Sequence, residues 1–406
     1  MNIETYSMSR SWKMLVWLFV IQLVIAFVGR SIAPLGLVIG EDLNLTKAQI
    51  GMFPAALFLG QAIISIPSGL LTDRIGSRYM MLLITLVLGT TFLIMSVTSS
   101  FILLLLFIVF AGFAYGSSHP TTNRGVVYWF PQRMRGTAMG LKQMGVTVGS
   151  ASAAIILLPI ANNNGWQVAV LCAAVSLLVV GLFVFFVYKE PKDNKLDNNQ
   201  TKDKISMNSI FRLFKHRVLV LITISAMLLS GSQMILNTFI ILFAYERIGL
   251  TLILAGTLLV IAEIGGSLGR ICWGMISDRI FKGKRIIVLF LISLIVASVT
   301  IIIAFLPEGT PYYALAVIVF IFGIGSSGFN GIWMNATTEI VVPSQAGVAT
   351  GFSITFSSLG AVLFPPIFGS IIDATGTYTS GWLFVTVLMA ISMVSLLIIL
   401  NSKKSS

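Results

Sequence analysis

A single arginine lies near the middle of the first long apolar run of this 406-residue chain. Lys13 and Asp42 bracket that run, and a helical rise of about 1.5 Å per residue puts Arg30 about 4–5 Å from its centre. An arginine at that depth costs roughly 2.5–3.5 kcal/mol, so it must face a polar cavity or a partner. Its planar fork of N–H donors suits a carboxylate or a phosphate. Arg30 is therefore a candidate anion-binding residue; the alternative is a structural ion pair without substrate contact.

Two titratable residues near the centres of other apolar runs are candidate proton carriers. Glu263 is the acid nearest to such a centre, and burial favours the protonated form of a carboxyl group. Alternatively, Glu263 balances Arg30, or pairs with Arg270 one heptad along the same helix face. His119 directly precedes Pro120, and histidine titrates near neutrality. His119 is a candidate for substrate contact or proton relay, or else a neutral histidine bonded to a nearby carbonyl.

Further polar residues indicate a cavity with surplus positive charge, which favours an anionic substrate. Arg124 and Lys142 lie about 10 Å from the centres of their runs, where they can line an inner vestibule and attract anions. Alternatively, Arg124 stabilises the inner ends of helices. A neutral set offers hydrogen bonds and an apolar platform for a small polar solute: Gln233, Asn237, Asn330, Trp333 and Asn335. Each of these alone is more often a helix–helix contact.

The elements that must hold these residues are membrane-spanning helices. Hydrophobic residues make up 57% of the chain and charged residues 10%, whereas soluble domains average about 25% charged residues. This composition excludes a soluble globular protein and a disordered one. Apolar runs of roughly 20 residues recur along the chain and predict twelve spans. They cover roughly 14–39, 48–71, 79–98, 101–130, 137–160, 166–188, 217–245, 252–277, 286–306, 312–341, 347–372 and 380–400.

The net charge of +12 has an uneven distribution along the chain. Most Lys and Arg residues lie at the amino terminus, in loops after even-numbered spans, or at the carboxyl terminus. This pattern predicts a multi-pass protein of the plasma membrane with both termini in the cytoplasm, and it argues against a nucleic-acid partner. The first run lacks a small-residue cleavage site and is expected to be a retained helix. Cys172 and Cys272 offer neither a disulfide framework nor metal-ligand spacing.

One long polar run, KEPKDNKLDNNQTKDK, separates the first six spans from the last six. It predicts an N-terminal bundle at 1–188, a cytoplasmic linker at 189–216 and a C-terminal bundle at 217–406. The following NSIFRLFKHR is a candidate helix on the membrane surface.

Two short matches predict that the halves are repeats. The segment GLLTDRI at 69–75 corresponds to GMISDRI at 274–280, and GTAMG at 136–140 corresponds to GVATG at 347–351. Both pairs occupy equivalent positions in the two halves. Three glycines should let the span at 137–160 approach a neighbour closely: Gly140, Gly145 and Gly149.

The first of these matches resembles a loop of the major facilitator superfamily. GLLTDRIGSR at 69–78 is similar to its G-x-x-x-D-R-x-G-x-R loop, and GMISDRIFKGKR at 274–285 to its degenerate second copy. The resemblance implies an all-α membrane protein with twelve transmembrane helices in two pseudo-symmetric six-helix bundles, which rock about a midplane site. In the two loops, aspartates can pair with nearby arginines and helix amino termini to form a conformational gate; the alternative is that these charges only set topology. The candidate gate residues are Asp73, Arg74, Arg78, Asp278 and Arg279.

A narrower resemblance covers residues 120–140. PTTNRGVVYWFPQRMRGTAMG is similar to the N-R-x-V-x-x-W-F-P-x-x-x-R-G-x-A-x-G stretch of organic-anion and sugar-acid symporters. Sugar-acid carriers of that branch often hold an acid about five positions before the proline, where this chain has Tyr115, so their coupling acid is not carried over. The stretch GLKQMGVTVGSAS lacks the Gly-Pro pair typical of drug/proton antiporters, which disfavours drug export.

These observations predict a secondary active transporter of a small organic anion, such as a sugar acid or another carboxylate. Proton symport is the expected coupling, with Arg30 as the anion anchor and Glu263 or His119 carrying the proton. The expected partners are the lipid bilayer, the anion and protons, and the chain is expected to be a monomer. The sequence shows no nucleotide-binding motif or metal cluster, so no cofactor and no enzymatic activity are expected. Two alternatives stay open: a proton-coupled exporter of drugs or amphipathic compounds, and a solute-sensing membrane receptor that does not transport.

Overall fold

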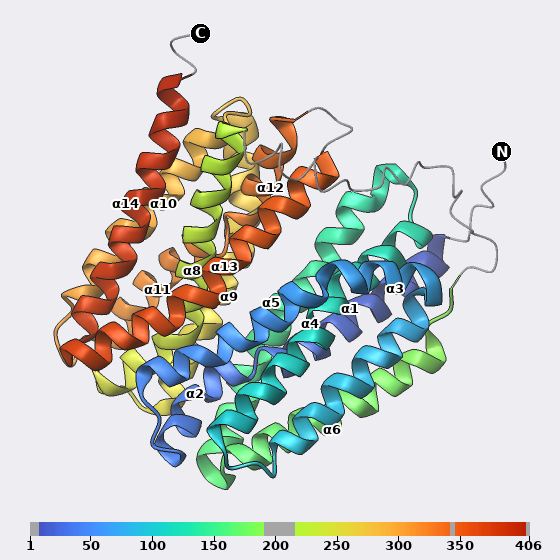
Figure 1. The fold of residues 1–406 in the computed structure, drawn as a ribbon, viewed down its shortest axis with the longest axis horizontal. Helices are drawn as coiled ribbons and strands as arrows, with labels where there is room; N and C mark the ends of the chain where they lie inside the picture. The colour runs from blue at the N-terminus through green and yellow to red at the C-terminus, as the bar shows by residue number, and fades with distance from the viewer. Residues whose placement is uncertain (1–7, 191–215, 342–345, 403–406) are drawn as a thin grey trace. The chain divides into compact units, whose positions relative to one another are not determined.

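The structure, a computed structural model, describes residues 8–190, 216–341 and 346–402. The described residues form α-helices joined by short connections, as the composition and the apolar runs predict (Figure 1). The helices are α1 (Met8–Gly29), α2 (Ile32–Asp42), α3 (Lys47–Met95), α4 (Phe101–Trp129), α5 (Gln132–Asn164), α6 (Trp166–Val187), α8 (Arg217–Glu246), α9 (Leu252–Arg279), α10 (Arg285–Ala304), α11 (Tyr312–Ser326), α12 (Asn330–Glu339), α13 (Ala346–Thr375) and α14 (Tyr378–Ser402).

Within these described ranges, 12 segments are long and apolar enough to cross a membrane, which confirms the predicted number. The first segment, Met8–Asp42, consists of α1 and α2, and the tenth, Tyr312–Glu339, consists of α11 and α12. The helix α3 contains two segments, Lys47–Ser65 and Pro67–Met95. Two of the predicted continuous spans are therefore broken helices.

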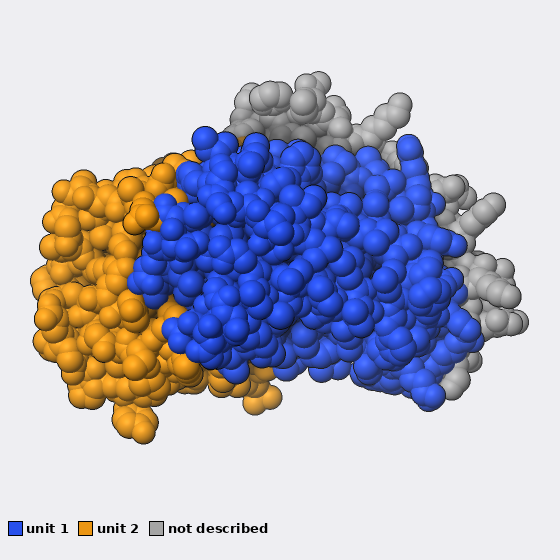
Figure 2. All heavy atoms as spheres, turned by 90° about the horizontal axis from the view of Figure 1, so that it is seen from below, with its two compact units in different colours: residues 1–43, 56–198 blue, residues 44–55, 199–406 orange. Residues whose placement is uncertain are grey.

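The chain divides into two compact units. Unit 1 consists of residues 1–43 and 56–198, and unit 2 consists of residues 44–55 and 199–406 (Figure 2). The first turns of α3 thus belong to unit 2, where Asp373 accepts hydrogen bonds from the backbone N–H groups of Lys47 and Ala48. Most of the predicted linker and of the candidate surface helix lies outside the described residues.

In unit 1, α1 is the central helix and packs against α4, α5 and α6 (Figure 1). Two of the three glycines that were expected to allow close approach do so. A Cβ atom on Gly145 would lie 2.9 Å from the carbonyl oxygen of Phe19, and one on Gly149 would collide with the carbonyl oxygen of Leu23. The expectation was wrong for Gly140, which has open space where its Cβ would be.

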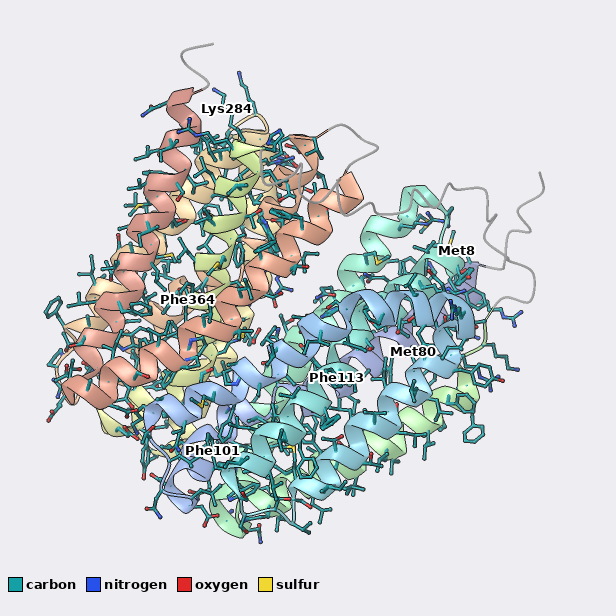
Figure 3. All side chains as sticks on the ribbon, viewed as in Figure 1. Met8, Met80, Phe101, Phe113, Lys284 and Phe364 are labelled. Carbon is teal, nitrogen blue, oxygen red and sulfur yellow. The ribbon has the colours of Figure 1, made fainter. Side chains whose placement is uncertain are left out.

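In unit 2, α8 packs against α13 and α14. Gly231 of α8 leaves room for the ring of Phe364, a side chain labelled in Figure 3, and this ring also contacts Phe384 with 6.1 Å between ring centroids. Fully buried Trp382 of α14 packs edge-on against Phe368, at 5.1 Å between centroids. Aromatic rings therefore fill the core between these helices, which fixes α8, and with it the polar residues that α8 carries.

Gly360 of α13 provides a direct test of the close contact between α8 and α13. A Cβ at Gly360 would collide with the main-chain oxygen of Met227, which belongs to α8 and cannot move independently. We expect Gly360→Ala to destabilise the protein by about 1–3 kcal/mol, measured as a lower thermal unfolding midpoint in detergent. Gly351→Ala is the matched control because Gly351 lies on the same helix beside open space, and it should be neutral or slightly stabilising. Equal effects of the two substitutions would contradict the packing.

Candidate functional site

The first span breaks at Arg30. Helix α1 ends at Gly29 and α2 begins at Ile32. Pro34 has no N–H to donate to the carbonyl of Arg30, four residues before it, and this explains the break. The hydroxyl of Ser31 donates to the carbonyl of Val28 at 2.7 Å, which supplies one of the hydrogen bonds at the irregular turn. The arginine thus lies in the turn between two helices, inside a membrane span.

The guanidinium of Arg30 is oriented by a tyrosine of α4. Its Nε donates to the phenolic oxygen of Tyr115 at 2.9 Å, and the arginine is partly exposed while the tyrosine is buried. A Cβ at position 29 would lie 2.5 Å from the tyrosine ring, so Gly29 is what lets the ring lie against α1. Because a phenol is neutral, this contact positions the guanidinium without cancelling its charge.

His119 lies one helical turn beyond Tyr115 on the same face of α4. The two rings meet edge to face, with 6.3 Å between centroids, and the histidine is partly exposed. Pro120 follows it inside the helix. Unit 1 therefore brings together Arg30, Tyr115 and His119, which we call the Arg30 cluster. From the sequence, Tyr115 was noted only as the position where sugar-acid carriers often have an acidic residue, and its contact with Arg30 was not predicted.

A second polar group, which we call the Lys142 cluster, lies further along α4. Its members are Gln22 of α1, Ser118, Thr122 and Asn123 of α4, and Lys142 of α5. The ammonium of Lys142 donates to Thr122 Oγ1 at 3.1 Å and to Asn123 Oδ1 at 2.8 Å. Thr122 donates to Gln22 Oε1 at 2.9 Å, and the amide of Gln22 donates to Ser118 Oγ at 3.4 Å. Lys142 is 1% exposed, so its ammonium lies inside the bundle and does not line an open vestibule.

Arg124 lies at the end of unit 1 that carries the 69–78 segment. Its Nε and Nη2 donate to the phenolic oxygen of Tyr128 at 3.0 and 2.5 Å, and its Nε lies 3.8 Å from Asp73 Oδ1. The arginine side chain is 16% exposed and the aspartate side chain 67% exposed. Asp73 therefore has an arginine beside it, as expected for a gate residue, whereas Arg74 is exposed.

The 69–78 segment is more helical than a loop. The helix continues through Asp73 and changes direction only at Gly76, whose φ of 88° is left-handed. Glu190, an acid that the sequence analysis did not select, accepts a hydrogen bond from the N–H of Ser77 at 2.5 Å, directly after the kink. Arg78 donates to the carbonyl of Phe185 at 2.9 Å and lies over its ring.

Tyr188 is buried beside this kink, and its phenol stays protonated. Burial, and next the nearby carboxylate of Glu190, raise the pKa of Tyr188 well above its usual range. A neutral phenol at this end of unit 1 adds no negative charge to the surroundings of Arg124.

The corresponding segment of unit 2 also contains a glycine with a positive φ, but its side chains have different partners. Gly283 has a φ of 79°, and it occupies the position of Gly76 when the two motifs are aligned. Arg285 donates to Asp278 Oδ1 at 2.5 Å and also contacts Glu339 Oε1 at 3.3 Å. Arg285 aligns with Arg78 when the two motifs are compared, and this alignment could have identified Arg285 as a candidate gate residue. Arg279, which was a candidate gate residue, is exposed.

The tenth span breaks between α11 and α12, and α9 satisfies backbone carbonyl groups around the break. Arg270 donates to the carbonyl of Ser327 at 3.2 Å, and the indole of Trp273 donates to that of Ile324 at 3.0 Å. The amide of Asn330, the first residue of α12, also donates to the Ser327 carbonyl, at 3.2 Å. Asn330 thus lies at the break and is partly exposed.

The other predicted polar residues of unit 2 are more enclosed. The indole N–H of Trp333 donates to Ser353 Oγ at 2.8 Å, and its ring stacks on Phe329, so this residue connects helices. Gln233 and Asn237 lie one turn apart on α8 and are buried; among the described residues, Asn237 Oδ1 has no hydrogen-bond partner. Glu263 is buried in α9, where its backbone carbonyl accepts from Ser267.

Twelve apolar helical segments in the described ranges, two of them broken around polar residues, define a polytopic membrane protein. The family model of the Major Facilitator Superfamily matches residues 18–365 and 289–406. The chain belongs to this superfamily, which confirms the resemblance read from the 69–78 motif. It is a multi-pass membrane transporter and not an enzyme.

Two curated relatives bear on the branch within the superfamily. The chain is 25% identical over 357 residues to the hexuronate transporter of Bacillus subtilis, a match covering 85% of this chain and 84% of that protein. It is 23% identical over 381 residues to the membrane sensor protein UhpC of Escherichia coli, covering 88% and 85%. These matches confirm a resemblance to the sugar-acid branch at low identity. The crystal structure of the nucleoside transporter NupG is similar with a TM-score of 0.81 and 16% identity, covering 95% of this chain and 99% of that one, and supports the fold alone.

Arg285 provides a test of the ion pairs at the end of unit 2. Its side chain is 13% exposed between two carboxylates, so Arg285→Met should destabilise the protein by about 1–2 kcal/mol, less than for a fully buried pair because both acids are exposed. The thermal unfolding midpoint in detergent measures this change. Arg279→Met is the control, because Arg279 is exposed on the neighbouring turn and should stay within about 0.5 kcal/mol of wild type. An equal loss in the control would contradict a specific role for Arg285.

Proposed function

We propose that this transporter moves a small organic anion, a carboxylate or sugar acid, across the plasma membrane by alternating access, in symport with protons. Arg30 is the residue that binds the anion. The observation that carries the proposal is the placement of its guanidinium, which is partly exposed, lies on a broken helix in mid-span and is oriented by the neutral phenol of Tyr115. A preorganised cation at that depth is suited to a charged group that arrives from water.

Arg270 shows what a structural arginine looks like in this protein. It donates to the Ser327 carbonyl, which lies beside the helix break, and in this way it stabilises the backbone. Arg30 instead donates to a side chain that is itself held between helices. A guanidinium presents its donors in a planar fork that matches the two oxygens of a carboxylate, so the substrate can bind it bidentately.

The neutral polar residues support a substrate with hydroxyl groups. His119 stands beside Tyr115 in unit 1, and unit 2 carries Gln233 and Asn237 on α8 and Asn330 at the break of the tenth span. Asn237 Oδ1 is enclosed and has no hydrogen-bond partner among the described residues, so a rearrangement that opens α8 to the substrate would provide an acceptor for a sugar hydroxyl. The similarity to a hexuronate transporter supports a sugar acid in particular.

Proton coupling is assigned to Glu263 or His119. Glu263 is a buried carboxyl group in the middle of α9, and His119 is a partly exposed imidazole in the Arg30 cluster. Taking up a proton with each anion offsets the negative charge that enters the membrane. The positive-inside pattern supports cytoplasmic termini, and we treat the chain as a monomer.

A second function deserves a test because one relative is named a membrane sensor. A sensor of this fold binds a solute at the same site and signals without moving it. Binding together with uptake into proteoliposomes supports transport, and binding without uptake supports the sensor.

Substituting Arg30 tests the anion site. In a thermal-shift screen of glucuronate, succinate, glucose 6-phosphate and cationic drugs, we expect anions to stabilise the purified wild type. Arg30→Ala should weaken binding of the best anion by roughly 10- to 100-fold, the value of a hydrogen bond to a charged group. Tyr115→Phe keeps the charge but removes the orienting phenol, so its loss should be smaller. Arg247→Ala, on the connection after α8, is the charge-matched control. Stabilisation by cationic drugs alone, or an unchanged affinity in Arg30→Ala, would overturn the proposal.

Glu263 is tested by uptake driven by an imposed pH gradient. In proteoliposomes, Glu263→Gln should abolish proton-driven accumulation of the anion, because the amide cannot carry a proton across, while anion–anion exchange continues. His119→Gln is the matched substitution for the other candidate. If accumulation by Glu263→Gln is undiminished, Glu263 is removed from the coupling role; if both variants accumulate the anion normally, neither residue couples.

A further inference from the structure

Lys142 is a buried titratable group that the proposed transport cycle does not yet use. Its side chain is 1% exposed, and its two hydrogen-bond partners among the described residues, Thr122 and Asn123, are both neutral. Burying an ammonium without an opposite charge is costly, so such an amine either acquires a counter-charge or gives up its proton.

Of the described helices that pack against α5 in unit 1, only α2 carries carboxylates, and these lie at its last turn. Helix α5 packs against α1, α2, α4 and α6, and no Asp or Glu occurs in α1, α4, α5 or α6. The acids of α2, Glu41 and Asp42, lie at its last turn, where Asp42 accepts from Trp166 and Gln167. Asp73 of α3 lies beside Arg124.

The other groups on these helices that can carry a positive charge are histidine, arginine and lysine side chains. Helix α4 carries His119 and Arg124, beside the phenols of Tyr115 and Tyr128, and the one titratable group of α6 is the thiol of Cys172. The charges of α1 are at Arg10 and Lys13 in its first turns, and Arg30 follows its end. Lys142 shares α5 with Arg133 and Arg135. The local electrostatic field therefore opposes a positive charge on Lys142 until an anion arrives.

The Lys142 cluster is connected to the Arg30 cluster through one face of α4. Tyr115, which orients Arg30, and Thr122, which binds Lys142, are seven residues apart, or about 10 Å along the helix. A unit charge at about that distance, at an effective dielectric constant of about 20, changes the proton affinity of an amine roughly 10- to 20-fold. Hydrogen bonds connect the two clusters: Lys142 donates to Thr122, Thr122 to Gln22 of α1, Gln22 to Ser118, and Ser118 to the backbone carbonyl of Tyr115.

We propose that protonation of Lys142 increases when an anion binds at Arg30 and decreases when the anion leaves, so that Lys142 adds to the protons taken up in the transport cycle. The lone pair of the neutral amine accepts a proton from water as the anion enters, and the ammonium returns that proton to water when the anion leaves. The positive charge of the proton offsets the negative charge of the bound anion. By thermodynamic linkage, protonation of Lys142 strengthens anion binding by the same factor. This inference rests on the proposed anion transport and adds to the proton carried by Glu263 or His119.

The first measurement needs no ligand. The thermal unfolding midpoint of the purified wild type is followed from pH 9 to pH 6, beside Lys142→Met, which is never charged, and Lys142→Arg, which is always charged. Relative to Lys142→Met, the wild type should lose a few degrees as the pH falls, because protonation then creates an unbalanced buried charge. Lys13→Met, an exposed lysine of α1, is the control and should follow the wild type. Parallel curves for wild type and Lys142→Met would overturn the proposal, whether or not any anion binds.

The second measurement counts protons. Whichever of glucuronate, succinate or glucose 6-phosphate stabilises the wild type most is added to protein in weakly buffered solution with a pH indicator. Proton uptake per bound anion should fall by up to about half a proton in Lys142→Met, the most that a roughly 10- to 20-fold change in proton affinity allows, and be unchanged in Lys13→Met. Unchanged uptake in Lys142→Met would show that Lys142 is not coupled to the anion and would overturn the proposal. If none of the three anions binds the wild type while the pH-dependent difference persists, the anion site itself fails, and the coupling fails with it.

Discussion

The constraint on which this structure depends is the cost of a positive charge inside the membrane. In unit 1, the phenol of Tyr115 is a neutral hydrogen-bond partner of Arg30, and the side chains of Thr122 and Asn123 are neutral partners of Lys142, whereas Arg124 lies beside Asp73. Neutral partners fix the position of a cation and leave its charge in place. The need to hold these basic groups in place explains why polar residues follow one face of α4 through an otherwise apolar span.

The same constraint applies to the backbone where helices break. A peptide group in the membrane must find a hydrogen-bond partner, so irregular backbone persists only where side chains or a hydrated cavity provide one. At the tenth span, Arg270, Trp273 and Asn330 donate to nearby carbonyl groups. At the first span, Ser31 donates to the carbonyl of Val28. The breaks bring polar groups to mid-span at a low cost in unsatisfied hydrogen bonds, and two of the proposed substrate ligands, Arg30 and Asn330, lie at them.

Hydropathy and composition predicted the number and class of the spans, because length and apolarity alone decide whether a helix can cross a membrane. The depth of Arg30 also followed from helical rise. Its partner did not, since a phenol on α4 meets α1 only through the space left by Gly29. The burial of Lys142 and the hydrogen bond from the Trp333 indole to Ser353 depend on how each helix is rotated about its own axis. The sequence does not define that rotation, because these spans are only weakly amphipathic. Glu190 was missed because its role depends on the kink at Gly76.

The two motif copies show how far a repeat constrains function. Both place a left-handed glycine after the Asp-Arg pair, at Gly76 and Gly283, so the duplicated sequence preserves the change of chain direction. The side-chain partners differ: Ser77 is bound by Glu190 in the first copy, whereas Arg285 binds Asp278 and Glu339 in the second. The first contact pairs a carboxylate with a backbone N–H, and the second pairs one guanidinium with two carboxylates, so salt should weaken the second more because its carboxylates are exposed. A conformational change that breaks both the Glu190–Ser77 contact and the Arg285 ion pairs would therefore cost a different free energy in each half. The repeat preserves a glycine with a positive φ in both segments, while the contacts that hold each segment also use an acid outside the motif, Glu190 in the first half and Glu339 in the second.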